Sequence, residues 1–514
     1  MSSEKGERPM IDKAEAEEVL GVTGLRLKFP GEPNLQFKDL SFSVKKGQKV
    51  LLLGPSGCGK STLLQVLCGI IPTSIEVPMQ SESLRLPSSW GMVFQDPDTQ
   101  FGMPFVDEEL AFVMENQCVP REEMEARMKR VLAEVGLQLG DLHTPIHSMS
   151  QGMKQRLALA AVLLLEPDVL LLDEPSALLD PEGTVQIWDA IHQIGANRTL
   201  LIVEHKLDHV LELIDRVVMF DDQGQIIADG APEMLFREEK SRLIEYGIWY
   251  PGVWDEYVAS SRYRNLMDED DMYAIAQRHD DAAPLVELRN FQGKRGKESR
   301  ILIQHAEIRS GEWIALLGEN GAGKSTLLLS LMQLLKTEGI YRLQGKDVQL
   351  RRGEVLSDQM AFVFQNPELQ FVTNSVQEEL GLSIGLNKSD AATAAEDPRV
   401  CEMLRHIQLE SERNRHPYQL SMGQKRRLSV ATALIHQRPL LLLDEPTFGL
   451  DARSTFAMLE MIEQWRQRGM AIVMVTHDRW IAEHFATRIW RIEQGHGVDT
   501  AITTRTERKM VVNV

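Results

Sequence analysis

Two glycine-rich segments carry the residues that would hold the phosphates of a nucleotide. Both fit the spacing G-x-x-x-x-G-K-[ST], in which backbone amides curl around the phosphates while a lysine and a hydroxyl complete the site. Glycines are needed because a Cβ would obstruct this close approach. With the threonine that follows each, the first segment comprises Gly54, Pro55, Ser56, Gly57, Cys58, Gly59, Lys60, Ser61 and Thr62, and the second comprises Gly318, Glu319, Asn320, Gly321, Ala322, Gly323, Lys324, Ser325 and Thr326.

The lysine and serine of each segment have distinct expected roles. We expect Lys60 and Lys324 to reach the β- and γ-phosphates, and the hydroxyls of Ser61 and Ser325 to bind Mg²⁺. The helix predicted after each loop presents the positive end of its dipole to the same phosphates. The pattern therefore predicts two ATP sites.

A pair of carboxylates follows an apolar run in each half of the chain. These pairs are Asp173-Glu174 and Asp444-Glu445. Phosphoryl transfer mainly requires positioning and charge neutralisation, so one carboxylate on the metal side and one on the water side suffice. We expect the aspartates to join the Mg²⁺ shell and the glutamates to polarise the attacking water.

Each of these landmarks occurs twice, in the same order. The offset between paired residues is 264 at the lysines and 270 to 272 at every later pair. The later pairs also include Gln95 with Gln365, Ser150 with Ser421 and His205 with His477. A repeat of this kind indicates a duplicated nucleotide-binding domain.

Short apolar runs must position these residues. Because they are apolar throughout, they are typical of buried parallel strands, and the chemical groups stand at their carboxyl ends, where open α/β sheets bind ligands. The runs are Val50–Leu53, Val169–Leu172 and Leu200–Val203 in the first half, and Trp313–Leu317, Leu440–Leu443 and Ala471–Val475 in the second. The pattern predicts an α/β fold.

Composition narrows the class of protein. The 514 residues carry a formal net charge of −19, which argues against a nucleic-acid-binding surface. No apolar stretch approaches the ~18–20 residues of a membrane helix, and the N-terminal residues lack the apolar core of a signal peptide. The four cysteines have no metal-ligand spacing, which fits a reducing cytosol.

The repeat and the charge pattern predict the domain boundaries. We expect a flexible tail over 1–18, a first domain over 19–255, an acidic linker over 256–283, a second domain over 284–495 and a C-terminal tail over 496–514. The linker is predicted from a run of aspartates and glutamates, which is usually a solvated segment.

Two further segments resemble a known family. Residues 149–156 read M-S-Q-G-M-K-Q-R and residues 420–427 read L-S-M-G-Q-K-R-R. Both resemble the signature sequence L-S-G-G-Q-x-x-R of ATP-binding cassette (ABC) ATPases. The resemblance implies two tandem P-loop NTPase domains. Each would have a mainly parallel sheet, an antiparallel β subdomain and a helical subdomain that carries the signature.

The resemblance also implies roles for paired residues. Gln95 and Gln365 would contact Mg²⁺ and relay to a membrane partner, and His205 and His477 would touch the γ-phosphate. The two domains would meet head to tail, so that each signature completes the other copy's ATP site. Residues implied in nucleotide contact are the signature residues Ser150, Gly152, Ser421 and Gly423, the D-loop aspartates Asp180 and Asp451, and the adenine-stacking candidates Phe29 and Phe291.

Both signatures depart from the family pattern. Gln151 and Met422 replace the first of the two glycines, and Met153 replaces the signature glutamine. These side chains would lie where a γ-phosphate docks, so we expect weaker closure or two unequal sites.

Within the family, one subgroup is the most similar. Residues 94–101 and 364–371 look like the segment F-Q-[ND]-P-x-x-Q-[FIL] of energy-coupling factor ATPases, and an acidic stretch follows each. That resemblance implies a peripheral subunit on the cytoplasmic face of a bacterial cell membrane. It would drive uptake of a vitamin or of cobalt or nickel, and the signature pair most resembles ATPases for thiamine or its hydroxymethylpyrimidine precursor.

The same resemblance implies partners. The chain would need an integral-membrane coupling protein and a substrate-binding membrane protein. We expect partner helices to fit grooves lined by 95–101 and 365–371, with Phe101 and Phe371 as apolar anchors.

Other classes with twin cassettes fit less well. Fused sugar-importer ATPases usually have one degraded site, whereas both sites here keep Lys, Asp, Glu and His. Translation factors that act on ribosomes would want a long basic linker. DNA-repair cassette proteins would want zinc cysteines or an inserted coiled coil. A scaffold without catalysis is disfavoured because both glutamates are present.

Overall fold

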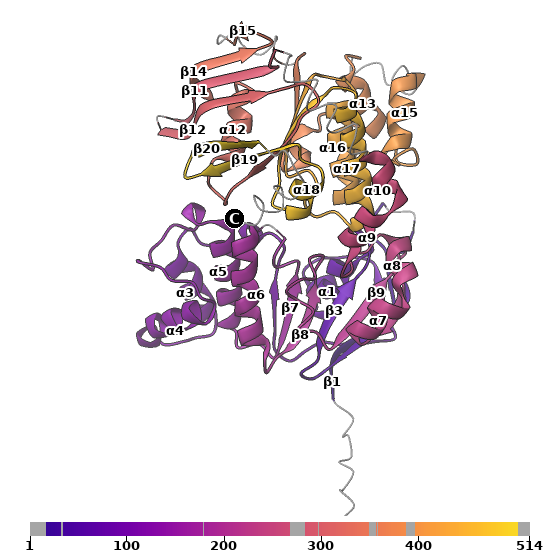
Figure 1. Ribbon diagram of the computed structural model, residues 1–514. Helices are drawn as coiled ribbons and strands as arrows, with labels where there is room; N and C mark the ends of the chain where they lie inside the picture. Colours follow the sequence, from indigo (N-terminus) through magenta and orange to yellow (C-terminus); the bar gives the residue numbers. More distant parts are fainter. Residues whose placement is uncertain are drawn as a thin grey trace, which may run out of the picture. The chain divides into compact units, whose positions relative to one another are not determined.

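The structure is a computed structural model that describes residues 17–501 apart from 32–33, 178, 268–282, 297, 349–355, 357 and 387–395. The chain divides into two compact units, Met1–Arg242 and Leu243–Val514, and each is an α/β domain (Figure 1). Most of the expected acidic linker, and most of both expected tails, lies outside the described residues.

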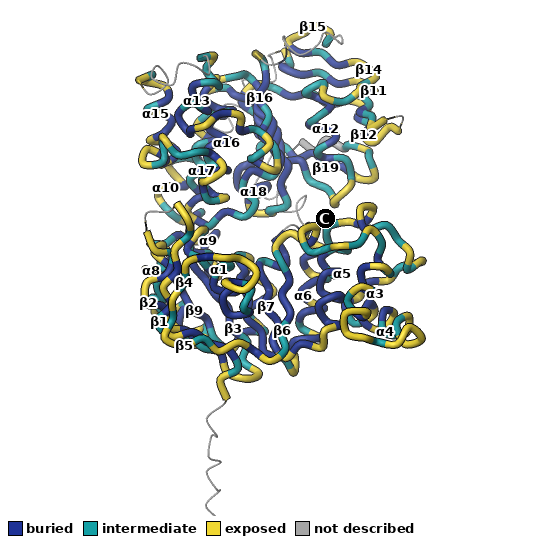
Figure 2. The backbone as a smooth tube through the Cα atoms, turned by 180° about the vertical axis from the view of Figure 1, so that it is seen from behind, coloured by how far each residue is buried: buried dark blue, intermediate teal, exposed yellow. Residues whose placement is uncertain are grey.

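A six-stranded sheet forms the centre of unit 1. Its strand order is β10-β9-β3-β8-β7-β6, and all neighbours are parallel except β10 and β9. The interiors of β3, β7 and β9 are buried (Figure 2), which confirms the predicted parallel sheet. The strands are β3 (Lys49–Leu53), β6 (Trp90–Val93), β7 (Val169–Asp173), β8 (Thr199–Val203), β9 (Arg216–Phe220) and β10 (Ile226–Gly230).

A smaller antiparallel sheet packs against the same core. It contains β1 (Glu18–Leu27), β2 (Phe37–Lys45), β4 (Met79–Gln80) and β5 (Ser83–Arg85). Leu25 and Phe37 of this sheet join Val50 and Leu64 in one cluster of buried side chains. The helix after the phosphate loop is therefore fixed from two sides.

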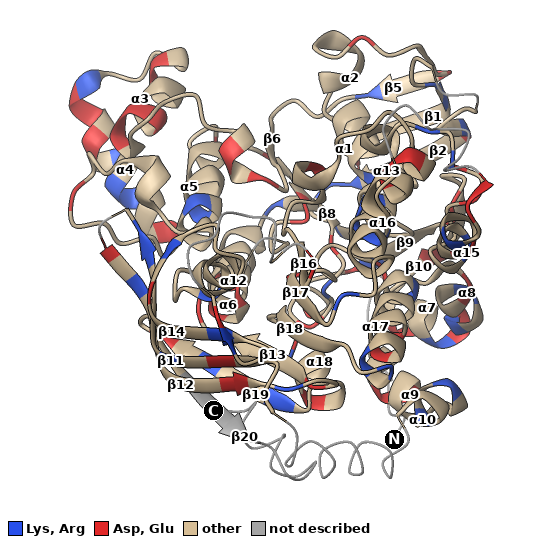
Figure 3. Ribbon diagram, turned by 90° about the horizontal axis from the view of Figure 1, so that it is seen from above, with Lys and Arg blue, Asp and Glu red and all other residues tan. Residues whose placement is uncertain are grey.

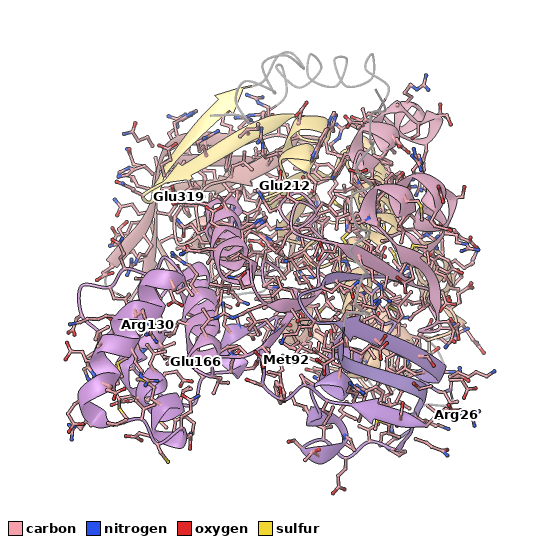
Figure 4. The ribbon with its side chains drawn as sticks, turned by 90° about the horizontal axis from the view of Figure 1, so that it is seen from below. Arg26, Met92, Arg130, Glu166, Glu212 and Glu319 are labelled. Carbon is pink, nitrogen blue, oxygen red and sulfur yellow. The ribbon has the colours of Figure 1, made fainter. Side chains whose placement is uncertain are left out.

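The helices of unit 1 include a group that carries the first signature. Among them, α3, α4 and α5 lie together (Figure 1), and α3 and α4 carry many charged residues (Figure 3). Arg130 on α4 and Glu166 after α5 line the same small cavity (Figure 4). The helices are α1 (Lys60–Leu67), α2 (Ile70–Thr73), α3 (Val106–Asn116), α4 (Arg121–Glu134), α5 (Gln151–Leu163), α6 (Pro181–Gly195) and α7 (Pro232–Glu238), with 3₁₀ turns η1 (Pro97–Thr99) and η2 (Ile146–Ser148).

Unit 2 repeats the architecture with one continuous ten-stranded sheet. The order is β15-β14-β11-β12-β20-β19-β13-β18-β17-β16, and the strands from β19 to β16 are parallel. They are β11 (Val286–Arg295), β12 (Glu298–Ile308), β13 (Trp313–Leu317), β14 (Lys336–Leu343), β15 (Lys346–Asp347), β16 (Met360–Val363), β17 (Leu440–Asp444), β18 (Ala471–Val475), β19 (Arg488–Glu493) and β20 (His496–Ala501).

The strand β20 lies beyond residue 495, where we expected the second domain to end. A tight turn at Gln494 and Gly495, with φ of 47° and 82°, returns the chain along β19. β20 also pairs in parallel with β12, so it joins the antiparallel part of the sheet to the parallel part. Because this segment is polar, we had predicted a tail here rather than a strand.

The helices of unit 2 begin within the segment that follows the first cassette. They are α8 (Lys240–Tyr246), in which the division between the units falls, α9 (Val253–Ala259), α10 (Ser261–Leu266), α12 (Lys324–Leu331), α13 (Val376–Ser383), α15 (Pro398–His406), α16 (Met422–Leu434), α17 (Ala452–Gln467) and α18 (Arg479–His484), with 3₁₀ turns η3 (Pro367–Gln370) and η4 (Pro417–Gln419).

Residues 243–266 belong to the second unit, although we expected the first domain to run to 255 and a linker to follow. The ring of Tyr257 stacks on that of Phe456 at 3.9 Å between centroids. The hydroxyl of Tyr263 donates to the carbonyl of His484 at 2.9 Å. These contacts join residues about two hundred positions apart in the sequence. The charge pattern, from which the linker was predicted, carries no information on them.

Among the described residues, no helix combines the length and the apolar character needed to cross a membrane.

Candidate functional site

Each phosphate loop joins a buried strand to a helix, as predicted. The first lies between β3 and α1, and the second lies between β13 and α12. The Nζ atom of Lys60 donates to the carbonyls of Gly54 at 2.8 Å and Pro55 at 3.0 Å. In the second loop the Nζ atom of Lys324 donates to the carbonyls of Gly318 and Glu319 at 2.7 and 2.8 Å. Both lysines are therefore folded back across their own loops.

The glycine before each lysine is required by the backbone and by its neighbours. Gly59 and Gly323 adopt φ of 104° and 115°, a left-handed conformation that other residues rarely adopt. A Cβ on Gly59 would lie 2.8 Å from the ring of Phe37, and one on Gly323 would lie 2.9 Å from the carbonyl oxygen of Arg300. Any side chain here would displace the loop.

Of the remaining loop residues, Cys58 and Thr326 are buried, whereas Glu319 is exposed (Figure 4). Ala322 packs against the core of unit 2. Glu319 is exposed at the rim of the second loop and contributes to the loop through its backbone carbonyl, which accepts from Lys324 and from the N–H of Ala322.

The serine after each lysine meets the aspartate of the carboxylate pair. The hydroxyl of Ser61 donates to Oδ1 of Asp173 at 2.9 Å, and the hydroxyl of Ser325 makes the corresponding bond to Asp444. Burial raises the pKa of both aspartates to about 6, and the adjacent glutamate adds to the rise. Hydroxyl and carboxylate oxygens are hard ligands of the kind Mg²⁺ prefers. The charges of the nearby phosphate-loop lysines lower the pKa of these carboxylates less than burial raises it, so a bound cation would stabilise their ionised form. The donor set fits Mg²⁺.

The glutamate of each pair has an unusual backbone conformation. Glu174 and Glu445 have φ of 48° and 50°, in the left-handed region. A conformation of this kind costs about 1–3 kcal/mol in a residue other than glycine and is often found at functional sites. The backbone N–H of Glu174 donates to Val203 at 2.8 Å and that of Glu445 donates to Val475 at 3.1 Å, so the neighbouring strand holds each residue in place.

The side chain of Glu174 contacts Gln95 and His205, two residues that the family resemblance assigned to Mg²⁺ and to the γ-phosphate. The Nε2 of Gln95 donates to one carboxylate oxygen at 2.9 Å, and the Nε2 of His205 lies 3.1 Å from the other. Burial alone would raise the pKa of Glu174, but His205 and Lys60 outweigh burial and hold it below its ordinary value. Glu174 is thus an ionised carboxylate at neutral pH.

The second copy has the same arrangement with one difference. The Nε2 of His477 lies 3.3 Å from Oε1 of Glu445, and the pKa of Glu445 is likewise lowered, against burial, by His477 and Lys324. Gln365 is exposed, and between Gln365 and Glu445, both among the described residues, the structure has no hydrogen bond like the one from Gln95. The two copies therefore hold their glutamates differently.

The signature serines and the D-loop aspartates all cap helices. The side chain of Ser150 accepts from the N–H of Met153 at the start of α5, and Ser421 forms a reciprocal capping box with Gln424 at the start of α16. Gly152 and Gly423 lie in the first turns of those helices. Asp180 caps α6 and Asp451 caps α17 in the same way. Their contact with a nucleotide remains a prediction.

The two adenine-stacking candidates have different outcomes. Phe29 lies just after β1 rather than on it and is only partly buried, so its ring remains a candidate. Phe291 is fully buried in the core and packs edge-on against Tyr341 at 5.7 Å. Phe291 cannot stack on a base, because its position on β11 points into the core. The prediction for Phe291 was wrong.

Sequence analysis missed two residues that hold the catalytic loops. Glu204, which is fully buried, accepts from the hydroxyl of Ser176 at 2.7 Å and from the N–H of His205 at 2.8 Å. Arg426, also buried, donates to the carbonyl of Glu445 at 3.1 Å. For Glu204 the available signal was a charge directly after the apolar run 200–203, because a buried charge needs partners. Arg426 lies in the polar run 423–427, which carried no such signal.

A doubly wound sheet with phosphate loops and carboxylates at the carboxyl ends of its strands defines a P-loop nucleotide triphosphatase. A family model described as "ABC transporter" matches residues 37–177 and 304–448. The chain therefore belongs to the ABC transporter family and contains two of its ATP-binding domains. It binds ATP, and it is an ATPase.

Full-length relatives agree with this assignment. The "Putative HMP/thiamine import ATP-binding protein YkoD" of Bacillus subtilis (strain 168) is 35% identical over 92% of this chain and 89% of its own. A "Putative ABC transporter ATP-binding protein" of Methanosarcina acetivorans is 36% identical over 91% of this chain and 83% of its own. Both relatives cover the two cassettes.

Two solved structures are also similar. CbiO1 from Clostridium perfringens, described as part of the ABC transporter complex CbiONQ, is 31% identical over 44% of this chain and 92% of its own, with a TM-score of 0.37. The archaeal ribosome recycling factor aABCE1, solved with the ribosomal stalk protein aP1, is 20% identical over 95% of this chain and 92% of its own, with a TM-score of 0.59. The second likeness concerns the fold alone.

Proposed function

We propose that this chain is the ATP-hydrolysing motor subunit of an importer of the energy-coupling factor type. It hydrolyses MgATP in both cassettes and works at the cytoplasmic face of a bacterial cell membrane, with an integral-membrane coupling protein and a substrate-binding membrane protein. We call residues 94–101 and 364–371 the Q-loop segments. The observation that carries the proposal is that a buried glutamate holds the loop after each Q-loop segment, and that exposed apolar side chains lie at the second one.

The chemistry is divided among residues that lie together in each unit. Lys60 and Lys324 exchange their loop carbonyls for phosphate oxygens. Mg²⁺, held by the serine and aspartate of each copy, would neutralise phosphate charge. Glu174 and Glu445 are ionised and oriented, so they accept a hydrogen bond from the attacking water, and the histidine beside each glutamate marks the γ-phosphate end of the site.

In both copies a glutamate accepts hydrogen bonds from the backbone of the loop that directly follows the Q-loop segment. Glu109 accepts from the N–H groups of Gly102 and Met103 at 2.9 and 2.8 Å. Glu379 accepts from the N–H groups of Val372 and Thr373 at 3.0 and 2.9 Å. A buried carboxylate that binds two backbone N–H groups makes a rigid loop, which a docking surface for a partner helix requires. This explains why an acidic stretch follows each segment.

The exposed side chains of this surface differ from those we expected. Phe371 is only 5% exposed and packs inward, whereas its neighbours Leu369 and Val372 are 68% and 56% exposed. The prediction that Phe371 anchors a partner was wrong because neighbouring residues of the turn face opposite ways. Leu369 and Val372 are the anchors we now propose. Their counterparts in the first copy are the exposed Thr99 and Gly102.

Leu369→Asp together with Val372→Asp should release the chain from membranes. Two charges in an apolar contact should weaken docking to the coupling protein by about 10–100-fold, the range of an interface hot spot. ATP binding should survive, because the phosphate loop is a separate segment. Fractionation of cells that carry the membrane partners measures the distribution of the chain between membrane and supernatant.

Leu334→Asp with Ile244→Asp is the matched control, since these apolar side chains are also exposed, at 58% and 53%. The control should stay with the membrane. A wild-type chain found with ribosomes, and lost from them with the steep salt dependence of phosphate contacts, would favour a twin-cassette translation factor instead.

The transported substrate that we favour is the hydroxymethylpyrimidine precursor of thiamine, with other vitamins or cobalt and nickel as alternatives. The name of the Bacillus subtilis relative supports this choice, as does the signature pair. In cells that depend on this transporter, Lys60→Ala with Lys324→Ala should abolish uptake of labelled hydroxymethylpyrimidine. Uptake of cobalt that falls while pyrimidine uptake is unchanged would contradict the choice.

A further inference from the structure

A segment between the two cassettes packs beside the loops of the second site. We call residues 243–266 the connector segment. Its rings contact α17, which begins a few residues after Glu445, and α18, which begins just after His477. The ring of Trp254 packs edge-on against Phe456 of α17 at 4.9 Å and stacks on Trp480 of α18 at 6.0 Å.

Two hydrogen bonds fasten the connector segment to the loop that leads into α17. The indole Nε1–H of Trp249 donates to the carbonyl of Leu450 at 2.8 Å. The carbonyl of Gly247 accepts from the N–H of Ala452 at 2.9 Å. These bonds flank Asp451, the residue that caps α17. The connector segment therefore fixes the end of this loop from both sides.

The same loop leads back to Glu445 through successive turns. The N–H of Leu450 donates to the carbonyl of Thr447 at 3.3 Å, and the N–H of Phe448 donates to the carbonyl of Glu445 at 3.3 Å. Arg426 holds the Glu445 carbonyl from the other side. Because Glu445 adopts a left-handed backbone conformation, it needs such support to keep its orientation.

Among the described residues, the first copy has no segment that makes contacts like those of the connector segment. Val185, Asp189 and Asp208 occupy the positions that match Phe456, Glu460 and Trp480. All three are exposed, and Val185 is 42% exposed. In the second copy, by contrast, Glu460 forms an ion pair with Arg262 and a hydrogen bond to Tyr257 of the connector segment. The anchoring side chains thus exist in one copy only.

We propose that the connector segment is a positioning element of the second ATP site, and that Trp249 is the positioning residue through which it holds the Glu445 loop. Turnover in the second copy then depends on a segment that lies outside both cassette cores. This inference rests on the role proposed for Glu445.

Trp249→Phe tests the proposal, because it keeps a ring but removes the donor to Leu450. We expect kcat for ATP to fall by about two- to tenfold, the effect of one lost neutral hydrogen bond, while KM stays within about twofold. Amide exchange of residues 445–452 should become faster. Trp465→Phe, on α17 but without a bond to this loop, is the matched control and should leave both measurements unchanged.

Gly247→Ala tests the second contact of the connector segment with this loop, the hydrogen bond between the carbonyl of Gly247 and the N–H of Ala452. The added Cβ would lie 2.5 Å from Cβ of Arg453 at a glycine with φ of 68°, so it should displace the loop and lower kcat as well. Both variants are also measured with Glu174→Gln, which confines hydrolysis to the second copy.

An unchanged kcat, or a lower kcat without faster exchange of residues 445–452, would overturn the positioning role. This failure differs from a failure of the proposed function. If Glu445 were not the base, Glu445→Gln itself would leave hydrolysis intact, whatever Trp249→Phe does.

Discussion

Replacement of Glu174 and Glu445 together by glutamine should abolish steady ATP hydrolysis while ATP binding is preserved. Loss of a positioned general base typically lowers a rate by ~10²–10⁴. Glutamine keeps the shape of the side chain and its contacts with the neighbouring histidine, and neither change touches the phosphate loops. The measurements are steady-state phosphate release and equilibrium binding of labelled ATP.

The surface glutamates Glu122 and Glu402 supply the control, since both are exposed and lie on helices. Glu122→Gln with Glu402→Gln should retain full hydrolysis. A double mutant of the site that hydrolyses ATP within threefold of the wild type would remove Glu174 and Glu445 from the role of base.

Asp173→Asn with Asp444→Asn should abolish Mg²⁺-dependent hydrolysis and at the same time stabilise each unit in the absence of nucleotide. Each aspartate has its pKa raised from 3.8 to about 6, so its ionised form is disfavoured in the folded state. At neutral pH that penalty is about 3 kcal/mol per site. Asparagine is uncharged and still accepts from the serine hydroxyl, so it avoids the penalty.

The sign of the pH dependence follows from the same shift. An acid with a raised pKa contributes stability that is fully present below pH 3.8 and is lost as the pH rises through about 6. The advantage of the asparagine variant should therefore be largest above pH 7 and shrink as the pH falls toward 4. Urea unfolding at a series of pH values measures it. A variant that is less stable than the wild type at pH 7.5 would contradict the prediction.

Local patterns predicted most of the site. The phosphate loops, the carboxylate pairs and the histidines lie where the sequence placed them, because each is defined by a short motif at the end of an apolar strand. The apolar runs 50–53, 169–172 and 440–443 likewise predicted the parallel strands β3, β7 and β17. Hydrophobic pattern is enough for elements whose two faces are both buried.

The features that the sequence did not predict depend on distant contacts. Whether Phe291 faces the core or a nucleotide depends on the register of β11, and whether Phe371 or Leu369 reaches solvent depends on the geometry of one turn. The packing of the connector segment depends on Phe456 and Trp480, which lie about two hundred residues further along the chain. Short motifs carry no information on such partners.

The two phosphate-loop lysines that bond to their own loop carbonyls have a thermodynamic consequence. Because Lys60 and Lys324 already have acceptors, arrival of a nucleotide exchanges one set of hydrogen bonds for another and adds few new ones. This exchange makes the affinity for the nucleotide lower than in a loop whose lysine ammonium group has no acceptor in the protein. It also gives each lysine somewhere to return when product leaves. An ATPase must release ADP in every cycle, so a moderate affinity of the loop for ADP favours turnover.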